Sequence, residues 1–300
     1  MTILDFRLHV FYTVAKRLNF TKAATDLFIT QPAVTKHIQE LESQFGTALF
    51  DRRGSKVSLT PAGQVLYGHA ESIMAIYRQI EFDINALSQQ LGGGLRLGAS
   101  STIAQYLIPP VLARFGQRTP EVSLSLVSGN TEQIEQALLQ NDIDLGLVEG
   151  RTHHSDIRYT PFVKDELVLV CRADHPLADR DEISLDELRT IPLVLRERGS
   201  GSLEIVEYAL RKAGLKESDL TVSMHLGSTE GIKAYLSSSS SMAFVSIFAL
   251  SDELRNGSLR VLDVADLSIQ RDFYAIQLQG ISEGLADVFM RFVRQHHNRR

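Results

Sequence analysis

A compact polar set at the start of one predicted helix has the chemistry to read DNA. Gln31, Thr35 and Lys36 fall within the short segment QPAVTK. A glutamine amide can bond an adenine edge with two hydrogen bonds, while threonine and lysine can bond bases or phosphates. Pro32 and Val34 can contact the methyl group of thymine. The proline costs little there, because a first-turn N–H has no partner inside the helix.

A second set places hydroxyl side chains and glycine where predicted strands give way to helices. This occurs at residues 100–102, 129–131, 198–202 and 228–229. Backbone N–H groups at such helix starts favour a carboxylate, sulfate or phosphate, although serine and threonine also cap helices without any ligand. The predicted ligand-binding residues are Ser100, Ser101, Thr102, Asn130, Thr131, Glu149, Arg198, Gly199, Ser200, Gly201, Ser202 and Thr229, with Arg196 as a further counter-ion.

A helix-turn-helix must position the first set. Helical spacing of apolar residues predicts helices over 6–18 and 22–28, the second capped by Thr21, and a third that Thr30 caps and Gly46 ends. The apolar positions of the third helix, which mark its buried face, are Val34, Ile38, Leu41 and Phe45. In this motif the second helix of the pair lies in the major groove, with its N-terminal residues facing the bases.

A basic hairpin follows the third helix. The segment TALFDRRGSKVSLTPAG predicts two short strands around a turn at residues 53–55. Lys56 and two arginines of this hairpin suit a wing that contacts phosphate. The alternative is an ordinary amphipathic surface helix beside a charged loop. The predicted DNA-binding residues are Gln31, Pro32, Val34, Thr35, Lys36, Arg52 and Arg53.

A long helix is predicted over residues 61–91, beginning at Thr60-Pro61. Its apolar residues alternate steps of four and three, at Leu66, Ala70, Ile73, Tyr77, Ile80, Ile84, Leu87 and Leu91. Such a heptad seam favours pairing with a second copy of the helix, although a helix packed on its own body is the alternative. Three glycines at 92–94 then predict a flexible joint.

Alternating strands and helices follow that joint. They include strands predicted over 122–129, 157–162, 166–172 and 271–278, and helices over 103–116 and 229–236. Two runs of similar order predict two α/β lobes, each on a mainly parallel sheet. The first lobe is predicted over about 95–163 and 268–300, and the second over about 164–267. In such domains a ligand lies between the lobes, where strand ends and helix starts meet, so the second set is expected to line one cleft.

Charge is unevenly distributed along the 300 residues. Residues 1–60 hold eight Lys or Arg and five Asp or Glu, giving +3, whereas the remainder holds 23 and 31, giving −8. This favours a polyanion-binding head on an acidic body. No signal peptide and no apolar run of about 18 residues is recognised, so no membrane partner is expected. The single cysteine, Cys171, lies in a predicted strand, and the cytoplasm is the predicted location.

The N-terminal segment resembles the signature of LysR-type transcriptional regulators. The shared elements are Phe20, Ala23-Ala24, Leu27, Gln31-Pro32-Ala33, Ile38, Leu41-Glu42, Leu49-Phe50 with Arg52, and Leu59-Thr60 with Ala62-Gly63. The resemblance implies an α/β multidomain protein: a winged helix-turn-helix over 1–60, a dimerising linker helix over 61–91, and a two-lobed, periplasmic-binding-protein-like effector domain over 92–300. It further implies a tetramer built as a dimer of dimers on double-stranded DNA, and recruitment of RNA polymerase.

Within that family, the chain looks similar to regulators of sulfur assimilation and of carbon fixation. The stretches GASSTIAQYLIPP, GNTEQIE and RERGSGS carry this resemblance. One departure is the run Ser238 to Ser241, where the family usually has glycine, and a serine with positive φ would be strained.

Three other classes remain as alternatives. An enzyme carrying a helix-turn-helix is disfavoured, because no Walker A, GxGxxG, GxSxG or HExxH motif occurs and no catalytic residue or cofactor is predicted. His153-His154 lacks nearby ligands, so no metal is expected. A solute-binding protein and a sequence-neutral DNA binder are the second and third alternatives. The predicted function is a sequence-specific transcriptional regulator controlled by a small anionic ligand, such as a carboxylate, between the effector lobes.

Overall fold

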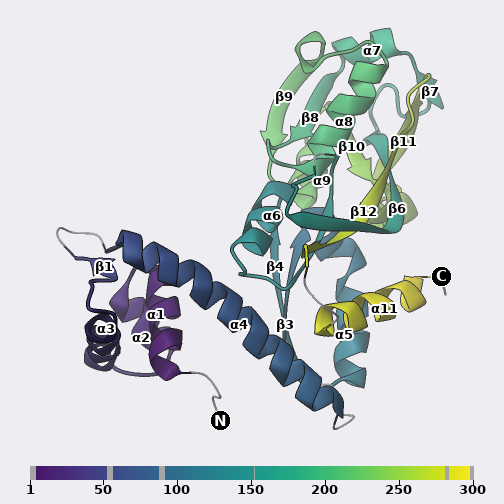
Figure 1. Cartoon of the computed structure of the whole chain (residues 1–300). Helices are drawn as coiled ribbons and strands as arrows, with labels where there is room; N and C mark the ends of the chain where they lie inside the picture. Colours follow the sequence, from purple (N-terminus) through teal and green to yellow (C-terminus); the bar gives the residue numbers. More distant parts are fainter. Residues whose placement is uncertain (1–4, 53–56, 88–91, 152, 281–283, 298–300) are drawn as a thin grey trace. The chain divides into compact units, whose positions relative to one another are not determined.

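The chain forms two compact units, Met1–Gly93 and Gly94–Arg300 (Figure 1). The structure is a computed structural model, and it describes residues 5–52, 57–87, 92–151, 153–280 and 284–297. Among these residues, no helix is long and apolar enough to cross a membrane.

The first unit is a three-helix head with a hairpin and a long helix. Its elements are α1 (Phe6–Arg17), α2 (Phe20–Asp26), α3 (Gln31–Phe45), β1 (Phe50–Asp51), β2 (Ser58–Leu59) and α4 (Pro61–Leu87). The predicted caps of α3 are confirmed: Thr30 Oγ1 accepts from the Ala33 N–H at 3.4 Å, and Gly46 ends the helix at φ 65°. The predicted cap of α2 is wrong. Asn19 caps it, because its extended backbone lets Oδ1 accept the Lys22 N–H at 2.9 Å.

The core of this unit corrects two further expectations. Val34, Ile38 and Leu41 are buried as predicted, but Phe45 is 53% exposed because it lies in the last turn, beyond the packed face. Ala70 of the heptad seam is fully buried in the same core. The N-terminal part of the seam therefore packs on its own unit. Ile80, further along α4, is 37% exposed, while the side chain of Leu87 and all of Leu91 lie outside the description.

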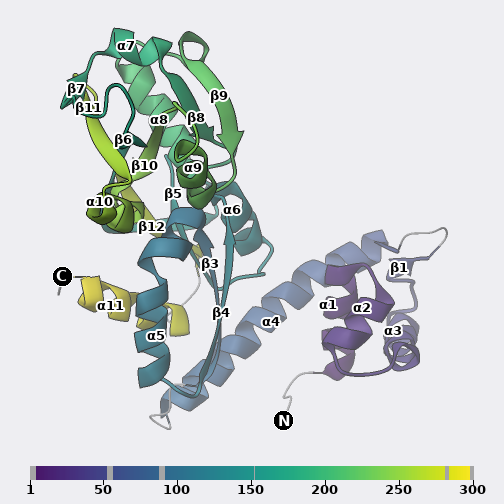
Figure 2. The same cartoon turned by 180° about the vertical axis from the view of Figure 1, so that it is seen from behind.

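The second unit is built on one eight-stranded sheet (Figure 2). Its strand path is β4-β3-β5-β12-β6-β11-β7, with β10 also paired to β6. β8 and β9 form a separate two-stranded sheet, which a bridge from Leu193 to Met242 links to the start of β10. The strands are β3 (Gly93–Ser100), β4 (Val122–Gly129), β5 (Leu145–Glu149), β6 (Ile157–Arg172), β7 (Glu182–Ile183), β8 (Pro192–Arg196), β9 (Thr221–Leu226), β10 (Ala243–Ser246), β11 (Leu259–Val264) and β12 (Ile269–Leu278). The helices are α5 (Pro109–Arg118), α6 (Thr131–Leu139), α7 (Leu185–Thr190), α8 (Gly201–Lys212), α9 (Thr229–Leu236), α10 (Ser251–Asn256) and α11 (Leu285–His297).

Two long strands hold the two lobes of this unit together. β6 and β12 pair antiparallel from Ile269↔Leu167 to Leu278↔Ile157, and they run through both lobes. The first lobe carries β3 to β5 with α5, α6 and α11, and the second carries β8 to β10 with α7 to α10 (Figure 2). Parallel pairing joins β3 to β5 and β8 to β9. The expectation of mainly parallel sheets is wrong, because β6 and β12 cross between the lobes and contribute antiparallel pairs to both.

Other differences from the sequence expectations are local. Gly93 and Gly94 belong to β3, so two of the three residues of the expected joint are in a strand. One strand, β6, replaces two predicted ones, and β7, α7, α10 and β11 were not predicted. The predicted helix over 103–116 is interrupted: a π-helical turn over Ile103–Leu107 precedes α5. None of the serines in the 237–241 run has positive φ, so the expected strain does not arise.

Candidate functional site

The first turns of α3 present most of the predicted DNA-reading residues to solvent. Gln31 and Pro32 are exposed, Thr35 is half-buried, and the Lys36 side chain is 75% exposed. Gln31 Nε2 donates to Thr35 Oγ1 at 2.9 Å, which aligns the two polar tips on one face. Val34 is a correction: it is fully buried in the core of the head, so its side chain cannot reach a thymine methyl.

The base of the wing anchors one arginine. The Arg52 guanidinium lies 4.5 Å from the centre of the Phe20 ring, and its Nη2 is 3.6 Å from Glu42 Oε2. Glu42 Oε1 also accepts the N–H groups of Leu49 and Phe50, at 2.8 and 3.2 Å. These contacts fix the start of β1 against α3. Arg53 and Lys56 lie outside the described residues.

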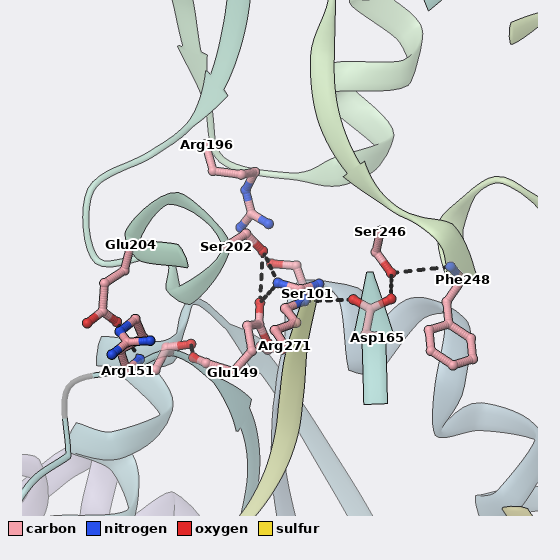
Figure 3. A network of polar contacts seen from close by, with 12 residues as sticks. Ser101, Glu149, Arg151, Asp165, Arg196, Ser202, Glu204, Ser246, Phe248 and Arg271 are labelled. Carbon is pink, nitrogen blue, oxygen red and sulfur yellow. Dashed lines mark hydrogen bonds and ion pairs between the residues drawn. The ribbon is translucent and has the colours of Figure 1, made fainter. Parts of the chain in front are cut away.

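Glu149, at the end of β5, is the centre of a buried polar network that joins the lobes (Figure 3). The Ser100 hydroxyl, at the end of β3, donates to its carboxylate. Ser202, in the first turn of α8 in the second lobe, donates to Glu149 Oε1 at 3.0 Å. The side chain of Glu149 is only 2% exposed, so these bonds replace the water it loses on folding.

Arg271 of β12 supplies the positive charge of this network. Its Nε donates to Asp165 Oδ2 at 2.6 Å, its Nη1 donates to Ser202 Oγ at 2.8 Å, and Nη1 lies 3.5 Å from Glu149 Oε1. Ser246 Oγ donates to the other oxygen of Asp165 at 2.8 Å. Arg271 Nη2 is buried and has no hydrogen-bond partner among the described residues. A guanidinium shared by two buried carboxylates makes the join between the lobes strongly electrostatic.

Two further buried polar residues lie beside the network: Ser101 in the first lobe and Arg196 in the second. Ser101 Oγ donates to the Gly129 carbonyl at 3.3 Å and accepts from Arg196 Nη2 at 3.3 Å. Arg196 is 5% exposed and also pairs with Glu197 at 2.8 Å. Ser200 Oγ is buried and has no hydrogen-bond partner in the described part of the chain. The site therefore holds both a buried guanidinium and an unused hydroxyl.

Of the remaining predicted residues, Asn130 and Thr131 are tied to this junction by hydrogen bonds. Thr102 and Thr229 are buried, and Thr131 Oγ1 donates to the Glu149 carbonyl at 2.6 Å. Asn130 caps α6, and its side-chain amide donates to the Arg198 carbonyl at 3.5 Å. The Arg198 side chain itself is exposed, so the buried cation of this loop is Arg196.

Two glycines permit the close approach of the lobes. A Cβ added to Gly201 would lie 1.9 Å from the Glu149 carbonyl oxygen, so only glycine lets α8 start against β5. Gly199 has φ +82°, which favours glycine, and its carbonyl accepts the Glu132 N–H at 3.2 Å.

Sequence reasoning missed Arg271 and Asp165. Arg271 begins the strand predicted over 271–278, and Asp165 falls in the gap between the strands predicted over 157–162 and 166–172. Nothing local marks either residue as buried. They oppose one another because β12 and β6 pair in one register, Arg271↔Asp165. A charged residue in a strand is usually solvent-facing, so only the pairing reveals this ion pair.

A second polar link joins the lobes at the π-helical turn. Tyr106 packs against the apolar cluster of the second lobe, and its hydroxyl donates to Glu230. Lys233 Nζ lies 2.8 Å from Glu230 and 2.7 Å from Glu253, and it donates to the Ala249 carbonyl at 3.0 Å. Burial raises the pKa of Tyr106, and the Glu230 carboxylate adds to that shift. Burial alone would lower the pKa of Lys233, but its two carboxylate partners outweigh burial and raise it.

Comparisons with known proteins cover both units. Residues 88–298 match the family model described as "LysR substrate binding domain", and residues 6–64 match "Bacterial regulatory helix-turn-helix protein, lysR family". The HTH-type transcriptional regulator CysL of Bacillus subtilis is 35% identical over 264 residues, covering 88% of this chain and 87% of that protein. The HTH-type transcriptional activator CmpR of Synechocystis is 35% identical over 267 residues, covering 89% of this chain and 86% of CmpR.

Two solved structures also superpose on this chain. The regulatory domain of Synechocystis CcmR, in complex with 2-PG, superposes with a TM-score of 0.62 at 30% identity, covering 68% of this chain and 97% of that one. Full-length CbnR in complex with its target DNA superposes with a TM-score of 0.65 at 20% identity, covering 97% of this chain and 98% of CbnR, which shows a shared fold.

The described residues contain no group of three or more His, Cys, Asp or Glu that could hold a metal ion. The chain belongs to the LysR family of DNA-binding transcriptional regulators.

Proposed function

We propose that a small anion, bound between the two lobes of the second unit, controls this regulator. The chain is a LysR-type DNA-binding regulator with an effector-binding domain, and not an enzyme. The observation that carries the proposal is the buried cluster at the junction of the lobes. There Arg196 donates to Ser101 across the lobes, and the buried Ser200 hydroxyl, just before α8, has no hydrogen-bond partner among the described residues.

The chemistry of this cluster favours an anion with several oxygens. A buried guanidinium and several hydroxyls are strong donors, and charge-assisted hydrogen bonds to carboxylate or phosphate are about twice as strong as neutral ones. Glu149 already occupies the donors on its own side, Ser101 is bonded to Gly129 and Arg196, and Arg196 Nε and Nη2 pair with Glu197. Among the described residues, the free capacity therefore lies with Arg196 Nη1, Ser200 and Thr102. The ligand of the CcmR relative, 2-PG (2-phosphoglycolate), is an anion, which supports the same class here.

We also propose that α3 enters the major groove. Gln31 and Lys36 have exposed polar ends, and Thr35 lies beside Gln31 on the same face. Pro32 is exposed at the first turn, and Arg52 at the base of the wing, with Arg53 next to it, would contact phosphate. Sequence is then read by the amide of Gln31, while the cations set the affinity.

The assembly follows from the family and from α4. We propose a dimer through residues 61–91 and a tetramer formed by two dimers, dividing the chain into 1–60, 61–91 and 92–300. Ile80 of α4 is exposed at a seam position. Ligand binding would shift the lobes and hence the spacing of the DNA-reading heads, which changes recruitment of RNA polymerase. A regulator that binds DNA shares its compartment, so we place it in the cytoplasm.

Thermal unfolding of the full-length chain tests the cleft. The probes are 2-phosphoglycolate, sulfate and acetate, and a ligand at about 100 times its Kd should add about 2.7 kcal/mol to the free energy of unfolding. Arg196→Gln should abolish the shift, whereas Arg189→Gln, at an exposed pair with Asp186, should retain it. A shift of equal size in Arg196→Gln would show that the anion binds elsewhere.

A further inference from the structure

A cavity of about 630 Å³ lies between α8 and the start of β12. We call it the α8 pocket. One wall comes from α8, with Ile205, Tyr208, Ala209 and Lys212, and from Gly150-Arg151 after β5. The other wall is the segment from Asp266 to Asp272, with Tyr274 beyond it. Its size is typical of sites for small molecules. It is distinct from the cluster of Arg196, Ser101 and Ser200, none of which lines it.

The first wall carries two cations around one aromatic ring. The Arg151 guanidinium lies 3.4 Å from the centre of the Tyr208 ring, and Lys212 Nζ lies 5.5 Å from it. Stacking holds the Arg151 plane in place but leaves its N–H groups available. Glu204, the nearest acid on α8, accepts the Arg151 backbone N–H at 2.9 Å instead of pairing with the side chain.

The opposite wall carries two carboxylates. Asp266 is exposed in the turn before β12, and Asp272 is half-buried on the strand. Within the described residues, the side chains of Asp266, Asp272, Arg151 and Lys212 make no hydrogen bond or ion pair. The pocket therefore separates two positive from two negative side chains that have not closed on each other.

The strand between these carboxylates also offers backbone groups. Over Ile269–Asp272, β12 pairs with β6 on one edge, and its pairing with β5 on the other edge begins only at Phe273. Among the described residues, the second edge thus has no strand partner along the pocket. Unpaired N–H and C=O groups at a strand edge are ready hydrogen-bonding partners.

We propose that the α8 pocket is a second small-molecule site, which takes a zwitterion of the free amino acid class. The ligand carboxylate would bind Arg151 and Lys212, and its ammonium group would bind Asp272 or Asp266. A ligand of one charge would satisfy one wall and be repelled by the other, whereas a zwitterion matches both. The free edge of β12 would bond its remaining polar groups.

The pocket shares its walls with the network between the lobes. β5 ends in Glu149 of the network and continues into Arg151 of the pocket. α8 begins with Ser202 of the network and continues to Tyr208, and β12 contributes Arg271 to both. A ligand in the pocket therefore contacts the same three elements that join the lobes.

The sequence contains no tryptophan, so one introduced tryptophan reports on the pocket alone. Tyr208→Trp in the full-length chain keeps an aromatic face for Arg151 and supplies that reporter. The probes are the free proteinogenic amino acids at millimolar concentration, with acetate and methylammonium as single-charge controls. At least one amino acid should change the emission saturably, and the two controls should not. Calorimetric titration of the unsubstituted chain with that amino acid should give the same Kd within a factor of three.

Charge variants in the Tyr208→Trp background decide the assignment. Arg151→Gln and Asp272→Asn should each raise the Kd at least tenfold. Arg211→Gln, on the same helix at a pair with Glu207, should leave it unchanged, as should Arg196→Gln in the cleft between the lobes. The proposal is overturned if no amino acid gives a saturable change. It is also overturned if the response survives both charge variants, or if acetate alone binds as tightly as the amino acid.

Discussion

The first turns of α3 and the junction between the two lobes both concentrate polar side chains, but in opposite states. On α3, Gln31 and Lys36 end in solvent. Between the lobes, Glu149 and Arg271 are buried, form an ion pair, and share Ser202 as a hydrogen-bond partner. A DNA-reading surface can keep part of its hydrogen-bonding capacity unused by the protein, because water occupies that capacity until the partner arrives. In the buried junction most polar groups pair across the lobes, and the exceptions in this network are Ser200 Oγ and Arg271 Nη2, which have no hydrogen-bond partner among the described residues. An anion bound there, as proposed, would move the lobes by competing for these pairs.

Of the changes proposed here, removing the guanidinium of Arg271 should have the largest effect on the free energy of unfolding. Arg271→Met would leave Glu149 and Asp165 buried without a counter-charge, and losing one partner of a buried pair costs about 3–5 kcal/mol. Unfolding the full-length chain with denaturant and following the transition of the second unit would measure this loss. Arg255→Met, at an exposed pair with Asp252, should change the free energy by less than about 0.5 kcal/mol. A loss below about 1 kcal/mol for Arg271→Met would mean that water reaches the network.

The steric contact between the lobes should give the next largest effect. In Gly201→Ala, the added methyl would overlap the Glu149 carbonyl, and overpacking of this kind costs about 1–3 kcal/mol. The free energy of unfolding measures the loss. The matched change Gly116→Ala on α5 meets nothing closer than 3.8 Å and should be neutral or stabilising, because alanine favours helix. Equal effects of the two changes would argue against close packing at Gly201.

On the DNA side, single changes should alter binding without changing stability. Gln31→Ala should cost about 1–3 kcal/mol on the preferred site and little on other sequences, because it removes a base contact. Lys36→Ala should weaken binding to all sequences and reduce the salt slope by about 1. Titration of operator and random DNA at several salt concentrations separates the two. If Lys36→Ala changed only the preferred site, Lys36 would be a base-reading residue instead.

The smallest expected effect concerns the second link between the lobes. Tyr106→Phe keeps the packing of the ring but removes the hydrogen bond to Glu230, at a cost of about 0.5–1.5 kcal/mol. Thermal unfolding would measure it. Tyr235→Phe is a suitable control, because Tyr235 packs on the same apolar cluster from within the second lobe. A larger loss in the control than in Tyr106→Phe would show that the hydroxyl at 106 does not join the lobes.

Much of the fold could be predicted because its signals are local. The caps at Thr30 and Gly46 and the ends of β4 and α9 follow from residue types a few positions apart. The convergence of Ser100, Ser202 and Glu149 could also be expected, since strand ends and helix starts meet between lobes in this kind of domain.

What only the tertiary structure decided concerns pairs that are distant in sequence. Val34 has the spacing of a core residue and the position of a DNA-reading one, and packing alone assigns it to the core. The heptad seam contains Ala70, which packs on its own head, and no periodicity distinguishes that from pairing with a second chain. Arg271 meets Asp165 through the register of two strands. The sequence by itself determined most of the helices and strands, and the family. The tertiary structure decided which charged groups are buried together, because burial depends on contacts that no short segment contains.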